Sequence, residues 1–178
     1  MQLFFKVKNQ SVKKIYQNIV KRSRSKFFYI KYNLEDSFET RFDLIIFHAF
    51  MIFYFYKNKK LDKSTIPQEL FDHMFSDFEN NLREMGFGDI AVNKKMKNFI
   101  RAFYGRLSQY SKSIELLKNE GDKSLLEQTI LNNIFKGNSS ENENIEMFVD
   151  YISGNINNFL NNSESKNIDN NFKFIEFG

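Results

Sequence analysis

The chain has no cysteine and no tryptophan, and only one proline and seven glycines among 178 residues. The absence of cysteine excludes a disulfide scaffold and any thiolate metal site. So few prolines and glycines leave little of the turn chemistry that a many-stranded β fold needs, so helices are favoured. The 22 phenylalanines and a hydrophobic content of 42% are enough for a buried core in a single domain of this length.

The sequence also lacks the usual signatures of catalysis. Its two histidines, His48 and His73, are not at the spacing of a helical ligand pair, and no HExxH, glycine-rich phosphate loop or GxSxG motif is present. The acidic residues are scattered rather than paired for acid–base chemistry. We therefore expect a protein that is not an enzyme and that uses no cofactor and no metal.

Acidic residues are absent from the first 34 positions, which carry nine lysines and arginines. Because the whole chain has a net charge of +4, the remaining residues are net negative. A basic arm of this kind is typical of contact with RNA or with an anionic membrane surface, and a solvated basic helix is the alternative. The aromatic run that closes it, residues 27–32, fits a strand, a helix end packed on the core or an interfacial anchor.

The N-terminal sequence does not resemble a secretory signal, because its apolar stretch is short and interrupted and no small-residue cleavage site follows. Residues 1–34 partly fit a mitochondrial presequence, which is rich in arginine and serine and poor in acid. We expect a cytoplasmic location with peripheral contact to the inner membrane as an option. The mitochondrial matrix is the less favoured location.

A long helix is predicted after Ser37, with Asp36 or Ser37 as its N-cap. Among the 13 residues 44–56 only His48 is polar. This run spans about 20 Å as a helix, whereas a bilayer core needs about 20 apolar residues. We therefore predict a central helix covered on all sides, with a membrane-lying segment as the alternative. His48 is predicted to be a buried neutral imidazole, and a ligand or general base is the other interpretation.

A further amphipathic helix is predicted from Pro67 to Met85. Thr65 and Gln68 have the spacing of a capping box, and the proline stands in the first turn, where its missing N–H is harmless. Apolar residues then recur at spacings of three and four. The sequence therefore predicts a helix with one apolar face.

A tight turn and a second helix follow at once. Gly86 suits a left-handed C-cap, Gly88 adds a permissive hinge, and Asp89 can cap the next helix. That helix is predicted to fade over residues 111–117, and its polar side carries Lys94, Lys95, Lys97, Arg101 and Arg106. Together the two helices predict a central αα-hairpin.

Two more helices are predicted, the first capped by Asp122 or Ser124 and the second over residues 144–160, where Gly154 can admit a close neighbour. The expected fold is all-α, a single compact, bundle-like domain of five to six helices. We divide the chain into a basic arm or first helix (residues 1–34), a helical domain (35–161) and a polar tail (162–178). The apolar residues that could return from this tail to the body are Phe172, Phe174, Ile175 and Phe177.

The hairpin sequence LREMGFGDIAVNKKMKNFIRAFYGRL, residues 82–107, is similar to the central signature of the ubiquinol–cytochrome c chaperone family. The shared features are the run of residues 82–86, Gly88 with Asp89, a lysine pair, and the run of residues 103–106. Upstream, Arg41 within an Arg-Phe-acidic-Leu run, followed by His48, also resembles the family. The resemblance covers roughly residues 36–160 and leaves out the basic arm.

The resemblance implies an all-α assembly factor for the cytochrome bc1 complex that binds newly made cytochrome b or other bc1 subunits. The ribosome is a further candidate partner, and no contact with DNA is expected. The alternative function is RNA or ribosome binding through the basic arm, and a weaker third is an enzyme that uses His48. The salt dependence of binding distinguishes bc1 assembly from RNA or ribosome binding. Binding to RNA weakens steeply as the salt concentration rises, whereas capture of an apolar client does not.

The candidate partner-binding residues are those of the hairpin that a helical core does not explain. They are Arg83, Glu84, Asp89, Lys94, Lys95, Lys97, Tyr104 and Arg106. Residues of the shared motif expected to be structural are Arg41, His48, Gly86, Gly88, Phe103 and Gly105. Arg83 or Arg106 could instead pair with Glu84 or Asp89 and stabilise the hairpin. We also expect that deleting residues 1–24 leaves the body folded, because few of their apolar side chains are assigned to the core.

Overall fold

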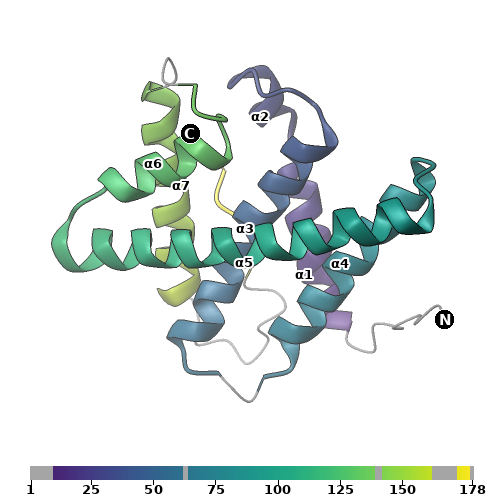
Figure 1. Ribbon diagram of the computed structural model, residues 1–178. Coiled ribbons are helices and arrows are strands. Elements are labelled where there is room, and N and C mark those ends of the chain that lie inside the picture. Colours follow the sequence, from purple (N-terminus) through teal and green to yellow (C-terminus); the bar gives the residue numbers. More distant parts are fainter. Residues whose placement is uncertain (1–9, 62–63, 139–141, 162–171, 177–178) are drawn as a thin grey trace.

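The computed structural model of the protein describes residues 10–61, 64–138, 142–161 and 172–176. Within these ranges the regular structure is helical and contains no strand, so the predicted all-α fold is confirmed (Figure 1). α2 is a short helix of five residues, and the other helices have ten or more. The helices are α1 (Gln10–Ser23), α2 (Lys26–Ile30), α3 (Phe38–Asn58), α4 (Ile66–Glu84), α5 (Asp89–Glu120), α6 (Ser124–Asn133) and α7 (Asn142–Asn161).

α3 lies at the centre of the fold, with α1, α5 and α7 against it (Figure 1). Ser37 caps α3 as predicted, because its Oγ accepts the N–H of Thr40 at 3.2 Å. Residues 42–56 are buried except for the half-buried Phe53, so the predicted central helix is confirmed. No helix in the described part of the chain has an apolar stretch long enough to cross a membrane.

α1 belongs to the core, which corrects the expectation that few apolar residues of the basic arm do so. Val12, Ile15, Tyr16 and Ile19 are buried on one face of α1, against α3 and α4. The Tyr16 hydroxyl also donates to Asp77 Oδ2 on α4 at 2.6 Å. The basic side chains of Lys13, Lys14 and Lys21 remain exposed. Deleting residues 1–24 would therefore uncover α3.

The aromatic run after α1 forms α2 and the turn that follows it. Phe28 and Tyr32 are buried, whereas Ile30 is 76% exposed. Both buried rings pack edge-on or tilted against Phe148 of α7. The sequence left three interpretations open for this run. For Phe28 and Tyr32 the structure agrees with a helix end packed on the core.

The turn between α4 and α5 has the predicted left-handed glycine. Gly86 has φ = 88°, and its N–H donates to Arg83 O while the N–H of Phe87 donates to Leu82 O. These two bonds form a Schellman motif, which satisfies carbonyls at the end of α4. Gly88 differs from the prediction, because its φ of −71° and ψ of 162° need no glycine. The prediction for Asp89 as N-cap is also wrong, since Gly88 occupies the N-cap position and Asp89 begins α5.

The capping box predicted at the start of α4 does not form. The Thr65 hydroxyl donates to Glu69 Oε1 at 2.6 Å, and Gln68 donates to Asp72 instead of returning to the cap. The acidic residues one turn further along α4 compete successfully for both side chains. The Ser64 hydroxyl accepts the N–H of Ile66 in their place.

α5 continues beyond the point where the sequence predicts that it fades. Ser113 and Ile114 are buried, and the Ser113 hydroxyl lies 3.1 Å from that of Thr129 on α6. The contact with α6 therefore stabilises the second half of α5. The helix ends at Gly121, which has φ = 73°. The predicted N-caps of α6, Asp122 and Ser124, are not in the N-cap position, which Lys123 occupies. Asp122 precedes it, and its Oδ1 accepts the N–H of Ser124, the first residue of the helix, at 2.8 Å.

Residues 172–176 lie against the body and join the same core. Phe172 is buried, and Phe174 and Ile175 are partly buried against core residues. A Cβ added at Gly154 of α7 would lie 2.8 Å from Ile175 Cδ1, so the predicted close neighbour of this glycine is confirmed. Phe177 lies outside the described residues. The division of the chain at residues 34 and 161 stays a prediction.

Replacing Gly86 with valine is expected to lower the free energy of unfolding by at least about 1 kcal/mol, because a β-branched residue resists positive φ. Gly105→Ala is the matched control. Gly105 is an exposed residue inside α5 where a Cβ would meet no atom within 4 Å, so alanine is expected to be neutral or stabilising. Urea denaturation measures both variants. Equal midpoints for Gly86→Val and the parent chain would show that this turn is not under conformational constraint.

Candidate partner-binding face on α5

The first half of α5 has one side turned to solvent. Ile90, Lys94, Lys97, Arg101 and Tyr104 are spaced by three or four residues and so share one face of the helix, which we call the α5 basic face. Ile90 is 88% exposed and Tyr104 is 56% exposed. No ion pair within the described residues neutralises the three cations of this face.

The opposite side of α5 holds the helix on the body. Val92 and Phe103 are buried there, and the Phe103 ring contacts those of Phe71 and Phe75 on α4. Phe103 therefore packs α5 onto α4. In Figure 1 the α4–α5 turn stands at one edge of the molecule, away from α6 and α7. The α5 basic face is thus carried by a firmly packed helix at an open edge.

Lys95 does not share this face. It is half-buried, and its Nζ lies 4.7 Å from the centre of the Phe87 ring, in a cation–π contact with the turn. This contact gives Lys95 a role within the hairpin. Its proposed contact with a partner stays a prediction.

Arg83 clamps the hairpin. Its guanidinium contacts Asp89 Oδ1 at 2.5 Å across the turn and Glu79 Oε1 at 2.8 Å one turn back in α4. The hydrogen bond from Arg83 lowers the pKa of the Asp89 carboxyl. Of the pairings expected for Arg83 from the sequence, the structure contains the one with Asp89, while Glu84 is exposed.

Arg106 lies apart from the exposed cations and pairs with a buried carboxylate. Its Nη2 is 2.6 Å from Asp43 Oδ1 on α3, and Asp43 is only 3% exposed. Lys136, which follows α6, contacts the other carboxylate oxygen. Burial raises the pKa of Asp43, and the positive charges of Arg106 and Lys136 oppose that rise. This ion cluster joins α3, α5 and the segment after α6, so Arg106 has a structural role. The pairing of Arg106 with Glu84 or Asp89, which the sequence left open, is not found among the residues that the structure describes.

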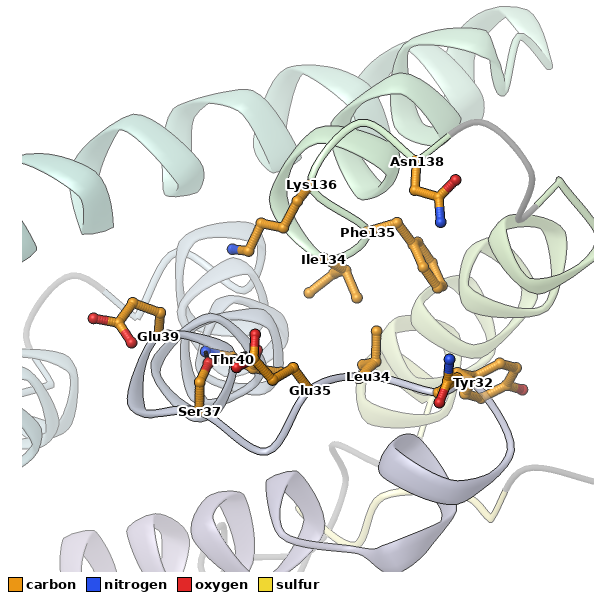
Figure 2. A pocket seen from close by; sticks show the side chains of 11 residues that line it. Tyr32, Leu34, Glu35, Ser37, Glu39, Thr40, Ile134, Phe135, Lys136 and Asn138 are labelled. Atoms are coloured by element: carbon orange, nitrogen blue, oxygen red, sulfur yellow. Dashed lines mark hydrogen bonds between the residues drawn. The ribbon is translucent and has the colours of Figure 1, made fainter.

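A pocket of about 380 Å³ lies beside this cluster, between the α2–α3 connection and the end of α6 (Figure 2). Figure 2 shows the Lys136 side chain extending from the segment after α6 toward α3, where it forms an ion pair with Asp43. The remaining lining mixes apolar side chains such as Leu34 and Phe135 with Glu35 and Glu39. Across the described residues, no group of three or more histidines and acids is placed to hold a metal ion.

His48 is fully buried and bonded on both sides of its ring. Nδ1 lies 2.7 Å from Leu44 O, and Nε2 lies 3.1 Å from the Tyr151 hydroxyl. Burial lowers the pKa of His48 to about 3, so the ring is neutral. An N–H at Nδ1 then donates to Leu44 O, and the Tyr151 hydroxyl donates to Nε2. His48 is therefore buried as predicted, and its surroundings favour the neutral imidazole.

Arg41 is the remaining motif residue, and it closes the turn before α3. Its Nε and Nη2 donate to the two carboxylate oxygens of Asp36 at 2.6 and 2.8 Å. Asp36 therefore pairs with Arg41 and leaves the capping of α3 to Ser37. The sequence offered no direct signal for this pairing or for the roles of Asp43 and Lys136.

Comparison with solved structures first defines the class of fold. The chain is similar to the crystal structure of the Cbp3 homolog from Brucella abortus, with a TM-score of 0.79 and 25% sequence identity over 97% of this chain and 92% of that one. The sequence profile of the family described as ubiquinol–cytochrome C chaperone matches residues 31–174. The chain belongs to the ubiquinol–cytochrome c chaperone family. No curated protein sequence matches it.

Replacing Arg106 with alanine is expected to lower the free energy of unfolding by about 3 kcal/mol, because Asp43 would stay buried with only one cation. Arg101→Ala, an exposed arginine on the same helix, is the control and is expected to change it by less than about 0.5 kcal/mol. Adding Asp43→Asn to Arg106→Ala is expected to restore part of the loss. If Arg106→Ala is as stable as Arg101→Ala in urea, the ion cluster contributes little to folding.

His48 is expected to make the fold acid-sensitive. Its pKa is about 3 when folded and about 6.5 when unfolded, so only the unfolded chain gains this proton between these values. Stability should therefore fall as pH falls below about 6.5, by up to about 1.4 kcal/mol per pH unit from this residue. His48→Gln should be less stable at neutral pH but show a shallower decline than the parent chain and than His73→Gln. Parallel pH profiles for His48→Gln and the parent would contradict this assignment.

Proposed function

We propose that the protein is an assembly chaperone for the ubiquinol–cytochrome c reductase complex and that it binds newly made cytochrome b, or another bc1 subunit, through the α5 basic face. The family supports the bc1 complex as the context. The observation that carries the choice of surface is the set of unpaired cations, Lys94, Lys97 and Arg101, flanked by exposed Ile90 and Tyr104.

The charges on this face are unfavourable within the isolated chain. Lys94, Lys97 and Arg101 are neighbours at spacings of three and four, where like charges repel by a few tenths of a kcal/mol per pair. The core needs only the other side of α5, so the fold gains nothing from this clustering. A partner segment with acidic groups beside an apolar side chain would relieve the repulsion and cover Ile90 or Tyr104.

In this proposal the protein is not an enzyme. It works in the cytoplasm, in peripheral contact with the inner membrane. A basic helix face with apolar and aromatic side chains also suits an anionic bilayer surface. The same side of the protein would then contact both the client and the membrane. The comparisons do not support the alternative in which the chain binds RNA through its basic first helix.

The variant Lys94→Ala/Lys97→Ala/Arg101→Ala tests this surface. We expect unchanged or slightly raised melting temperature, because repulsion is relieved, together with a lower level of assembled bc1 complex in cells. Lys13→Ala/Lys14→Ala/Lys21→Ala is the matched control, since it removes the same number of exposed charges from α1. A folded α5 variant with normal bc1 levels would refute the proposed surface. A defect confined to the α1 variant would favour the alternative function.

A further inference from the structure

Residues 172–176, which we call the tail segment, contact the body through hydrogen bonds and apolar packing. They lie on a surface made by α1, α3 and α7 (yellow in Figure 1). We call this surface the tail site, and its contacting residues are Arg22, His48, Phe55, Tyr56, Gly154, Asn155 and Phe159.

Two side chains of the tail site bind the main chain of the tail segment. Asn155 Oδ1 accepts the N–H of Ile175 at 2.8 Å, and Arg22 Nη2 donates to Ile175 O at 3.0 Å. Asn155 is completely buried, and its amide nitrogen is held by Tyr151 O at 2.8 Å. Main-chain groups are common to every peptide, so this pair of bonds does not depend on which residue occupies position 175.

The side chains of the tail segment enter apolar positions. The Phe172 ring lies 5.2 Å from the rings of both Phe55 and Phe159. The Phe174 ring lies 4.9 Å from that of His48. Ile175 uses the space left by Gly154, whereas Lys173 is exposed. The site therefore accepts the pattern aromatic, any residue, aromatic, aliphatic.

A surface hollow lies beside the tail segment. A pocket of about 400 Å³ remains between α1 and the tail segment, and its lining includes Asn18, Lys21 and Ser25 from the body side. Without the tail segment, the aromatic side chains of Phe55 and Phe159 would lose their cover and leave an apolar patch, which soluble chains rarely expose. The tail segment therefore covers apolar side chains of the body and leaves a hollow beside it.

We propose that the tail site is a peptide-binding site that the chain's own tail occupies until an apolar segment of a partner protein, with aromatic residues at its first and third positions and an aliphatic residue at its fourth, displaces it. This inference rests on the proposed function only in taking the partner to be an apolar client. It adds a second surface, on the α1–α3–α7 side, to the α5 basic face. A tethered tail competes at an effective concentration in the millimolar range, so a free peptide binds the intact chain weakly.

The test uses the full chain with Phe172→Ser/Phe174→Ser, which releases the tail, and a fluorescent peptide of residues 171–177, NFKFIEF. Fluorescence anisotropy is expected to show at least about tenfold tighter binding to this variant than to the intact chain. The same peptide with both phenylalanines replaced by serine is expected not to bind. Adding Gly154→Leu, which fills the Ile175 position without weakening a helix, is expected to abolish binding. A folded released variant that does not bind the peptide overturns the proposal.

Hydrogen exchange on the intact chain decides the matter if the released variant does not fold. The amide of Ile175 is expected to exchange at least about tenfold faster than that of Ile152 in α7, because the tail segment opens without global unfolding. Equal rates would make the tail segment a permanent part of the core and overturn the proposal. Concentration-dependent dimers of the intact chain that disappear with Phe172→Ser/Phe174→Ser would assign the site to a second copy and overturn it too.

These outcomes are independent of the α5 basic face. The variant Lys94→Ala/Lys97→Ala/Arg101→Ala, combined with the released tail, is expected to bind the peptide as tightly as the released chain alone. Peptide binding with normal bc1 assembly in the α5 variant would leave the tail site supported and the proposed surface refuted. Loss of bc1 assembly without peptide binding would give the opposite result.

Discussion

The fold depends on the burial of α3 from every side. Covering a large apolar side chain contributes about 1.5–3 kcal/mol, and residues 42–56 are almost all covered. A helix without a polar face cannot lie at the surface, so α1, α5, α7 and the tail segment must surround it. Its two polar exceptions both have partners: His48 is bonded to Leu44 O and Tyr151, and Asp43 forms ion pairs with Arg106 and Lys136.

This arrangement divides α5 into two functional parts. Its second half is held by α3 and α6, through Arg106, Tyr110 and Ser113. Its first half needs only one side for packing on α4, which leaves the α5 basic face open. A long, well-anchored helix can therefore present a charged surface without exposing the core, which is what a chaperone that must itself stay folded requires.

The sequence predicts those features that depend on local pattern. The length of the apolar run identifies α3 as central, and Gly86 identifies the turn. Ion pairs between distant parts of the sequence are not predictable in this way. In the sequence Arg106 is one more cation on a basic helix, because its partner Asp43 lies far away along the chain. The sequence places residues 10–23 in a basic arm because charge dominates their composition. The helical spacing of Val12, Ile15, Tyr16 and Ile19 is the signal for the core helix that they form. The capping box at Thr65 fails because Glu69 competes for its hydroxyl.

Photo-crosslinking in the native cell tests whether the α5 basic face contacts a bc1 subunit. A photoreactive residue at position 97, in place of Lys97, is expected to crosslink to cytochrome b or another bc1 subunit. The same residue at position 14, in place of the exposed Lys14 on α1, is expected to give no such product. Crosslinks from position 97 to ribosomal components alone, or equal bc1 crosslinking from both positions, would show that the α5 basic face is not the surface that binds bc1 subunits.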